Sequence, residues 1–326
     1  MIRPEGLLRG SFLVLDIDPR PGLSFFLVMG SIDSEPKRSE SRAAYKSKLL
    51  SAVPDRVSVT ADRVSFGYRQ VSSNEKKRLV QEQFNPIART YDLADTILSF
   101  GLDSRWRKKA IRLLGLEPGA LVLDACGGTA GLTRLAAARS GPSGHITVYD
   151  FNRPMMDAGK KRLRTAAPPP SGKMCSISFV QGDAEDLSFP ARTFDAVTIG
   201  FGIRNLAHPE KGLAEFFRVL KPGGKLMILE FSLPVNPLLR RLYHFYSFHW
   251  MPFAGRLVCG TGTSFRYLAE SIRVFPAPDA LAEEIKRVGF SDVRFDRLSN
   301  GIAVVYLAVK RGPVAQNKRV AAEVRP

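Results

Sequence analysis

The chain has 326 residues, of which 44% are hydrophobic, so it is long enough for a sizeable core and a globular enzyme is the default expectation. Its formal net charge of +17 favours an anionic partner, but the basic residues are spread along the chain and do not form one dedicated binding tail. The three cysteines are widely spaced, which excludes a disulfide framework and a paired-cysteine metal site and fits a reducing compartment.

The N-terminal part is predicted to be a loosely ordered extension, and Met29 is an alternative start. Its apolar runs are interrupted by Asp16, Asp18 and Pro21, so they are too short for a membrane-spanning helix or a signal peptide. Several acidic residues argue against a transit peptide. We therefore expect a cytoplasmic protein. The expected divisions are an extension over 1–62, a folded domain over 63–311 and a basic tail over 312–326.

From about residue 72 the sequence predicts regular secondary structure. Apolar residues recur at helical spacing over 74–84 and again over 87–116, until Pro118 and Gly119 end that region. Strand-like and helix-like segments then alternate. The predicted strands are 120–126, 145–150, 177–184, 194–202 and 225–231, and the predicted helices are 131–140, 152–166 and 212–220. This alternation predicts a parallel sheet with helices on both faces.

The C-terminal segment 292–310 departs from the alternation. It holds two strand-like runs joined by Ser299-Asn300-Gly301, which is a hairpin signal. The last strand should therefore run antiparallel to the rest of the sheet.

Small and acidic residues follow the first three predicted strands of the alternating region. Asp124 and a run of small residues over 125–131 come after the first, Asp150 after the second, and Asp183 with Ala184 after the third. In an open parallel sheet a ligand binds beyond the carboxyl ends of the strands. A loop of small residues allows close backbone approach, and a carboxylate can accept both hydroxyls of a ribose.

The glycine spacing separates two cofactor classes that use this layout. The glycines are Gly127, Gly128 and Gly131, which do not match the G-x-G-x-x-G pattern of dinucleotide sites. The acidic residue that opens the loop is instead typical of methyltransferases that bind S-adenosylmethionine. The joint pattern at three strand ends favours that cofactor over the alternative of structural turns and surface acids.

The chain resembles the ubiquinone/menaquinone-biosynthesis C-methyltransferases of the UbiE type from about Val64 to Lys310. The resemblance is carried by "FGYRQV", "VQEQFNPIARTYDLADTILSFGLDSRWR", "LDACGGTAGLT", "GDAEDLSFPARTFDAVTIGFGIRN", "RVLKPGGKLMILEFSLP", "YSFHWMPFAGRLV" and "SFRYLAESIR". It implies an α/β fold of the Rossmann-like class I methyltransferase type, with a mostly parallel seven-stranded sheet and an antiparallel C-terminal hairpin. It also implies S-adenosylmethionine as the cofactor.

Contacts to the cofactor are expected from the strand-end residues. They are Asp124, Gly127, Gly128, Thr129, Asp150, Asp183, Ala184 and Gly200. The resemblance assigns Thr129, Asp150, Asp183 and Ala184 this role.

The chain departs from the family pattern at several positions. The family usually has a serine where Gly200 stands and an acid where Gly131 stands, so two polar contacts to the cofactor are lost. Ala130 is tolerable in the loop if its backbone stays at a negative φ, since a Cβ penalises positive φ. Near the C-terminal helices, Thr261-Gly262-Thr263 and Phe265 also differ from the family, which bears on substrate choice.

A long insertion over about 233–272 is expected to build the substrate pocket. Its aromatic residues are Tyr243, Phe245, Tyr246, Phe248, Trp250 and Phe253, with His249 among them. We expect Tyr246, His249 and Trp250 to line a slot for a flat ring and an apolar tail, with filling of the core as the alternative. The neighbouring leucines and arginines of 238–243 form a short amphipathic stretch that could contact an anionic membrane.

The expected reaction is methyl transfer to a ring carbon of a prenylated quinol. That carbon becomes nucleophilic when an adjacent hydroxyl loses its proton, and the fixed charge of Arg204 is suited to stabilise the phenolate. Asn205 would orient the ring oxygen, and Tyr91, with His249 as a second candidate, would relay the proton. A structural ion pair is the alternative role for Arg204, and packing is the alternative for His249.

Other functions remain open from the sequence. They are an O- or N-methyltransferase acting on another small molecule or RNA, and a non-catalytic protein that keeps the fold for binding. No nucleic-acid partner and no metal ion are expected. Besides the prenylated quinol, the expected partner is the inner face of an anionic membrane, contacted peripherally. A homodimer or a complex of quinone-biosynthesis enzymes is also open.

Overall fold

The computed structural model describes residues 11–14, 28–31, 62–165 and 175–312, which fall into two compact units divided at Ala61 and Asp62. In the first unit, strand β1 (Ser11–Val14) pairs with β2 (Val28–Ser31) in an antiparallel arrangement. Most of the extension predicted for 1–62, and nearly all of the predicted tail, lie outside the described residues.

The second unit is built on a seven-stranded sheet with the order β10-β11-β9-β8-β5-β6-β7. The strands are β5 (Leu121–Ala125), β6 (His145–Asp150), β7 (Ser176–Gln181), β8 (Phe194–Gly200), β9 (Leu220–Phe231), β10 (Ser291–Leu298) and β11 (Ala303–Val309). The pairs among β5 to β9 are parallel, whereas β11 is antiparallel to both β9 and β10. The predicted fold class, including the C-terminal hairpin, is confirmed.

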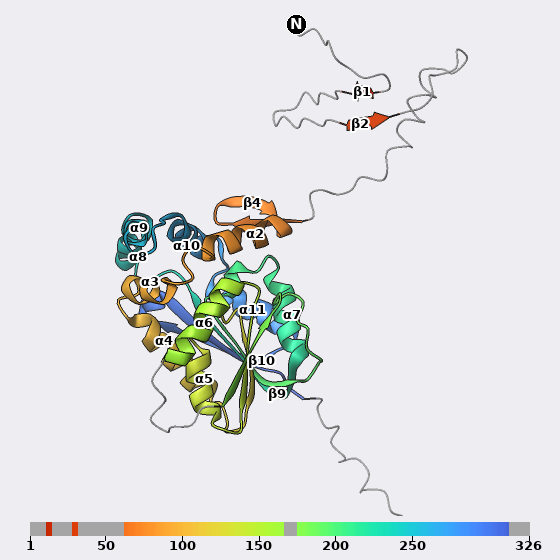
Figure 1. Ribbon diagram of the computed structural model, residues 1–326, viewed down its shortest axis with the longest axis vertical. Helices are drawn as coiled ribbons and strands as arrows, with labels where there is room; N and C mark the ends of the chain where they lie inside the picture. Colours follow the sequence, from red (N-terminus) through yellow and green to blue (C-terminus); the bar gives the residue numbers. More distant parts are fainter. Residues whose placement is uncertain (1–10, 15–27, 32–61, 166–174, 313–326) are drawn as a thin grey trace, which may run out of the picture. The chain divides into compact units, whose positions relative to one another are not determined.

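Alternating side chains of the central strands fill two separate cores. In β5, for example, Leu123 belongs to one core and Val122 to the other. The first core is closed by α7 (Pro209–Val219) and α11 (Pro278–Val288), and the second by α4 (Leu102–Leu114) and α5 (Thr133–Ser140). Figure 1 shows α4, α5 and α6 (Arg153–Thr165) on one side of the sheet and α7 with α11 on the other. Strands buried on both faces explain the continuous apolar runs in the sequence.

The strand order reverses at β5, which lies between β6 and β8. The connection after β5 leads to β6 on one side, and the connection after β8 leads to β9 on the other side. A crevice therefore forms at the carboxyl ends of β5 and β8. The short η1 helix (Ile203–Asn205) directly follows β8 at this edge.

Additional elements cover that edge of the sheet. They are the hairpin β3 (Arg63–Phe66) and β4 (Arg69–Ser72), helices α2 (Ser73–Phe84) and α3 (Tyr91–Leu98), and the segment α8 (Pro237–Phe245), η2 (Tyr246–Trp250), α9 (Met251–Cys259) and α10 (Thr263–Val274). Helix α10 packs against α2 and α9, and the Phe66 ring stacks on Tyr267 of α10 with 4.2 Å between the ring centroids. The predicted insertion thus corresponds to a helical cover, which Figure 1 shows beside α2 and α3.

Candidate active site

The loop after β5 turns sharply before α5 begins. Cys126, Gly128 and Ala130 all have a positive φ, of 51°, 48° and 61°. The condition of a negative φ, under which Ala130 would be tolerated without strain, is therefore not met. Its side chain is buried and its N–H donates to the Gly127 carbonyl at 2.8 Å, so the tight turn imposes the left-handed conformation despite the Cβ.

Asp124 lies below this loop. Its carboxylate is buried and accepts hydrogen bonds from the hydroxyls of Thr133 at 2.5 Å and Thr198 at 2.8 Å. Burial raises the pKa of Asp124, although both hydroxyls favour the charged form. The side chain ties β5 to α5 and β8, and it is not among the residues that line the cleft described next.

An elongated cleft runs along the carboxyl ends of β5, β6 and β8 and continues past β7. Its two halves share Cys126, Asp150, Phe151, Asn205 and Leu206. Of the predicted cofactor residues, the first half is lined by Gly127, Gly128, Thr129, Asp150 and Gly200, and the second half by Asp150, Asp183 and Ala184. The structure therefore brings together every predicted cofactor residue except Asp124.

Asp150 occupies the middle of the cleft. One of its carboxylate oxygens accepts from the Gly128 N–H and the other from the Asn152 N–H, both at 2.8 Å. Burial raises its pKa to about 6. A carboxylate in this position can accept further hydrogen bonds from the two hydroxyls of a ribose.

The second half of the cleft is fastened to helix α2 by ion pairs. Lys77 contacts Asp183 at 2.6 Å and Glu185 at 3.3 Å. Between these two acids in the sequence, Ala184 is buried and lines the cleft. At the opposite end, the Thr129 hydroxyl donates to Asp92 of α3 at 2.7 Å, so α2 and α3 together hold the cover of the cleft in place.

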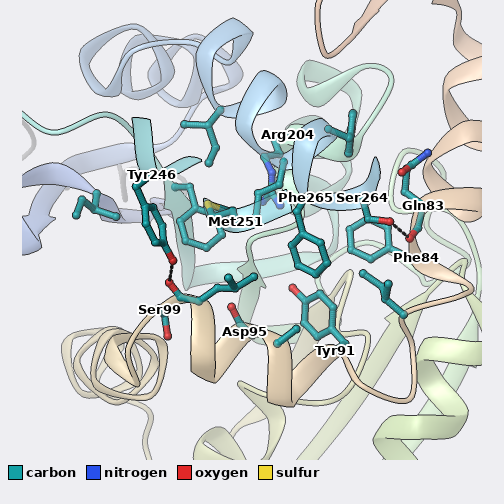
Figure 2. A pocket seen from close by; sticks show the side chains of 18 of the residues that line it. Gln83, Phe84, Tyr91, Asp95, Ser99, Arg204, Tyr246, Met251, Ser264 and Phe265 are labelled. Carbon is teal, nitrogen blue, oxygen red and sulfur yellow. Dashed lines mark hydrogen bonds between the residues drawn. The ribbon is translucent and has the colours of Figure 1, made fainter. Parts of the chain in front are cut away.

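A separate cavity lies under the helical cover. It adjoins the cleft, because Phe84 and Tyr91 line both. Figure 2 shows Phe84, Phe265, Met251 and Tyr246 around it, with the Tyr246 hydroxyl donating to the Leu98 carbonyl at 2.5 Å. The lining is mainly apolar, as expected for a pocket that holds a ring and a hydrocarbon tail.

The structure does not bring His249 and Trp250 into this cavity. Both side chains are exposed, Trp250 by 52%, and neither is among the lining residues. The π-helical turn η2 gives these residues a different direction from Tyr246. Phe245 and Phe253 are exposed as well.

Arg204 lines the cavity but is paired with a buried acid. Its Nη1 donates to Glu230 at 2.6 Å and to the Phe201 carbonyl at 2.5 Å, and its Nε has no hydrogen-bond partner among the described residues. Asn205 accepts from the Tyr267 hydroxyl at 3.0 Å and lines both halves of the cleft, but it does not line the cavity. The ion pair that was the alternative role for Arg204 is therefore present.

Tyr91 stands at the junction of cleft and cavity. Burial raises its pKa well above the usual value, and nearby Asp95 acts in the same direction. The hydroxyl therefore remains protonated at neutral pH and can donate a hydrogen bond to a ligand. Figure 2 shows Tyr91 below the ring of Phe265.

Several site residues were missed from the sequence. Val80 and Phe84 reach the cleft from α2, and Arg107 reaches it from α4. The helical periodicity of these segments indicates which residues are buried, but not that they are buried against a ligand space.

The described part of the chain holds no cluster of histidine, cysteine, aspartate or glutamate side chains suited to a metal ion. None of its described helices is both long enough and apolar enough to span a membrane.

The sequence matches the ubiE/COQ5 methyltransferase family over residues 69–310. The chain belongs to this family. Similar proteins include UbiE of Ectopseudomonas mendocina, which is named a ubiquinone/menaquinone biosynthesis C-methyltransferase. It is 43% identical to this chain, and the match covers 75% of this chain and 94% of the relative. UbiE of Legionella pneumophila is 40% identical, and the match covers 75% of this chain and 96% of the relative. UbiE of Pasteurella multocida is 38% identical, and the match covers 82% of this chain and 98% of the relative.

Membership in the ubiE/COQ5 family confirms the predicted resemblance and the prediction of an S-adenosylmethionine-dependent methyltransferase. The cleft fits that cofactor. Asp150 offers a carboxylate that can accept hydrogen bonds from ribose hydroxyls, and the half of the cleft with Asp183 and Ala184 has room for a further part of the ligand.

Proposed function

We propose that the protein transfers a methyl group from S-adenosylmethionine to a ring carbon of a prenylated quinol. Its UbiE relatives are named ubiquinone/menaquinone biosynthesis C-methyltransferases, which supports this proposal. The observation that carries this proposal is the direct contact of two ligand spaces of opposite character. A polar cleft with a ribose acceptor adjoins a mainly apolar cavity, and Phe84 and Tyr91 form their shared wall. A methyl donor in the first space would therefore face a ring in the second.

Three polar side chains that line the cavity support this role. They are Tyr91, Asp95 and Arg204. The charge of Arg204 is balanced by Glu230, but its buried Nε–H has no partner and can donate to an oxygen that becomes a phenolate. Tyr91 can donate to the same oxygen, and Asp95 can accept its proton through water. The apolar walls exclude water from the electrophilic methyl group.

The reaction should depend on the redox state of the substrate. In the quinol the ring oxygens donate electron density to the carbon, whereas in the quinone that carbon lies between carbonyls and is itself electrophilic. Purified protein with methyl-labelled S-adenosylmethionine and a demethylated quinone should transfer label only after dithionite or borohydride reduces the quinone. The label should remain on carbon after acid hydrolysis of ethers.

Two results would contradict this function. Efficient transfer to the oxidised quinone would exclude a quinol carbon as the nucleophile. Label recovered as a methoxy group would identify an O-methyltransferase, the rival enzyme class. A control with reductant but without quinone accounts for label that is transferred to the protein itself.

We also propose that the helical cover contacts an anionic membrane. Six large apolar side chains of α8, η2 and α9 are exposed by 52 to 74%. They are Leu238, Leu242, Phe245, Trp250, Phe253 and Leu257, and we call them the apolar face. Such a set exceeds the scattered exposed apolar residues of an ordinary surface.

Basic side chains accompany the apolar face. Arg240, Arg241 and Arg256 are exposed on the same helices. Tyr246 and Met251 of this segment line the cavity, so a prenyl tail leaving the cavity between these helices would enter the lipid directly. Apolar contact plus neighbouring arginines is the pattern of a helix that lies in the interface of an anionic bilayer.

A further inference from the structure

The first half of the cofactor cleft contains one buried cation that the family contacts do not include. Of the residues that line this half, Arg107 is the only positively charged one and Asp150 the only ionised acid. Asp150 also lines the second half of the cleft, together with Asp183, whereas Arg107 does not. Arg107 and Asp150 therefore lie at opposite ends of the first half. A cofactor with its ribose at Asp150 and its adenine beyond it directs its amino-acid end toward Arg107.

Gly131 makes room for the Arg107 guanidinium. A Cβ added to Gly131 would lie 2.7 Å from Nη1 of Arg107. Gly200 is also near, since a Cβ added there would lie 3.7 Å from the same atom, an ordinary contact distance. Any side chain at 131 would displace the guanidinium from the cleft, so Arg107 and Gly131 depend on each other.

The guanidinium is held in place and still has donors to offer. Its Nη2 donates to Asp95 at 2.7 Å, its Nε lies 3.7 Å from Asp103, and its Cζ lies 5.0 Å from the centroid of the Phe201 ring. Nη1, the atom nearest the two glycines, donates to none of the described residues. Its two N–H groups therefore remain for a ligand in the cleft.

We propose that Arg107 binds the α-carboxylate of S-adenosylmethionine through Nη1. A carboxylate is the ligand that a fixed guanidinium fork favours, and the side chain is only 11% exposed, so water competes weakly. The opposite orientation would place the carboxylate beside ionised Asp150, which repels it. Arg107 is thus a cofactor-positioning residue at the end of the cleft opposite the adenine. This inference concerns the cofactor and does not depend on the quinol substrate.

The test compares S-adenosylmethionine with decarboxylated S-adenosylmethionine, which keeps the amine and lacks only the carboxylate. We expect calorimetry to show that the native protein binds the first about 10- to 100-fold more tightly, the range of one charge-assisted contact. In Arg107→Met this preference should fall to within about threefold of equality. Arg105→Met, the same change at an exposed position of α4, should keep the preference.

A purely structural role for Arg107 would weaken both ligands equally and leave their ratio unchanged, which would overturn the proposal. An equal affinity of the native protein for both ligands would overturn it as well. Removal of Arg107 leaves Asp95 and Asp103 without their cation, so Arg107→Met could fail to fold.

Gly131→Ala keeps the charges of Arg107, Asp95 and Asp103 and tests the same contact independently. The added Cβ would lie 2.7 Å from Nη1 and push the guanidinium out of the cleft, so S-adenosylmethionine binding should weaken about 10-fold or more while binding of the decarboxylated form does not weaken. Equal weakening of both ligands by Gly131→Ala, with the fold intact by circular dichroism, would show that the loop was merely distorted and would contradict the proposal.

Discussion

At the scale of single residues, the pKa of Asp150 links cofactor binding to pH. Burial raises this pKa to about 6 from an ordinary value of 3.8. The ionised carboxylate accepts hydrogen bonds from the ribose, so affinity for S-adenosylmethionine should fall as pH drops below about 6. In Asp150→Asn, affinity should be weaker at pH 7.5 by about 1.5 to 3 kcal/mol and nearly independent of pH between 5 and 7.5. Calorimetric titrations at several pH values measure both effects.

The same raised pKa affects the stability of the ligand-free protein in the opposite direction, because stability decreases as pH rises. The folded state binds the proton of Asp150 more tightly than the unfolded state does, so this stabilisation is present below about pH 4 and is lost as pH rises through about 6. Relative to Asp150→Asn, the native free energy of unfolding should decrease over this window by an amount on the order of 3 kcal/mol. Asp157→Asn, an exposed acid on α6, should show no such difference.

At the scale of elements, helix α2 is fastened over the loop that follows β8 by Lys76. Its ammonium is buried and donates to the carbonyls of Leu206 at 2.6 Å and Arg204 at 3.4 Å. Burial lowers its pKa to about 8, whereas the unfolded chain keeps the proton up to about 10.5. The unfolded state therefore binds more protons between these values, and stability should rise with pH there.

We expect the native protein to gain about 2 kcal/mol of unfolding free energy relative to Lys76→Met between pH 8 and 9.5. Urea titrations at the two pH values measure this difference. Lys108→Met, at an exposed position of α4, removes the same charge without the burial and serves as the control. If the unfolding free energy of the native protein and of Lys76→Met changed equally with pH, burial would not lower the pKa of Lys76.

The sequence could predict the elements because their signals are local. Alternating apolar strands and helices, the small-residue loop after β5 and the hairpin at Ser299–Gly301 each follow from neighbouring residues. The strand-end position of Asp150 and Asp183 follows from the parallel sheet, since carboxyl ends of its strands meet at one edge.

Contacts between distant segments could not be predicted in this way. Glu230, which pairs with Arg204, comes from the end of the neighbouring strand, and nothing local indicates that the two charges meet. The π-helical turn η2 changes the helical phase, so Tyr246 faces the cavity while Trp250 faces outward. The positive φ of Ala130 depends on how the loop closes onto α5, which the residue type itself disfavours.

At the scale of the whole molecule, the high basic charge and the apolar face together predict reversible membrane binding. Long-range attraction to anionic lipid is screened by salt, whereas apolar contact requires direct insertion. The protein should sediment with vesicles containing phosphatidylserine at low salt and be released by about 0.5 M NaCl, where the Debye length is well below 10 Å. It should bind neutral vesicles much more weakly.

Tryptophan fluorescence can locate the contact, because the chain has two tryptophans in different environments. Trp106 is 5% exposed in the core, while Trp250 lies in the apolar face and is 52% exposed. Brominated lipids should therefore quench the emission of Trp250 in the native protein and leave Trp250→Phe unquenched. Quenching that persists without Trp250, or strong binding to neutral vesicles at high salt, would contradict this orientation.

Substitutions in the apolar face test whether membrane binding requires insertion of apolar side chains in addition to electrostatic attraction. Phe245→Ser combined with Phe253→Ser removes two large apolar side chains, each worth about 1.5 to 3 kcal/mol when fully buried, and should abolish sedimentation with vesicles even at low salt. Val274→Ser, at an exposed apolar position of α10 outside the apolar face, should leave vesicle binding unchanged. Because the cavity lies beneath the same helices, the double variant should lose activity with a long-tailed quinol in vesicles. It should keep activity with a short-tailed, water-soluble quinol, which reaches the cavity without the bilayer.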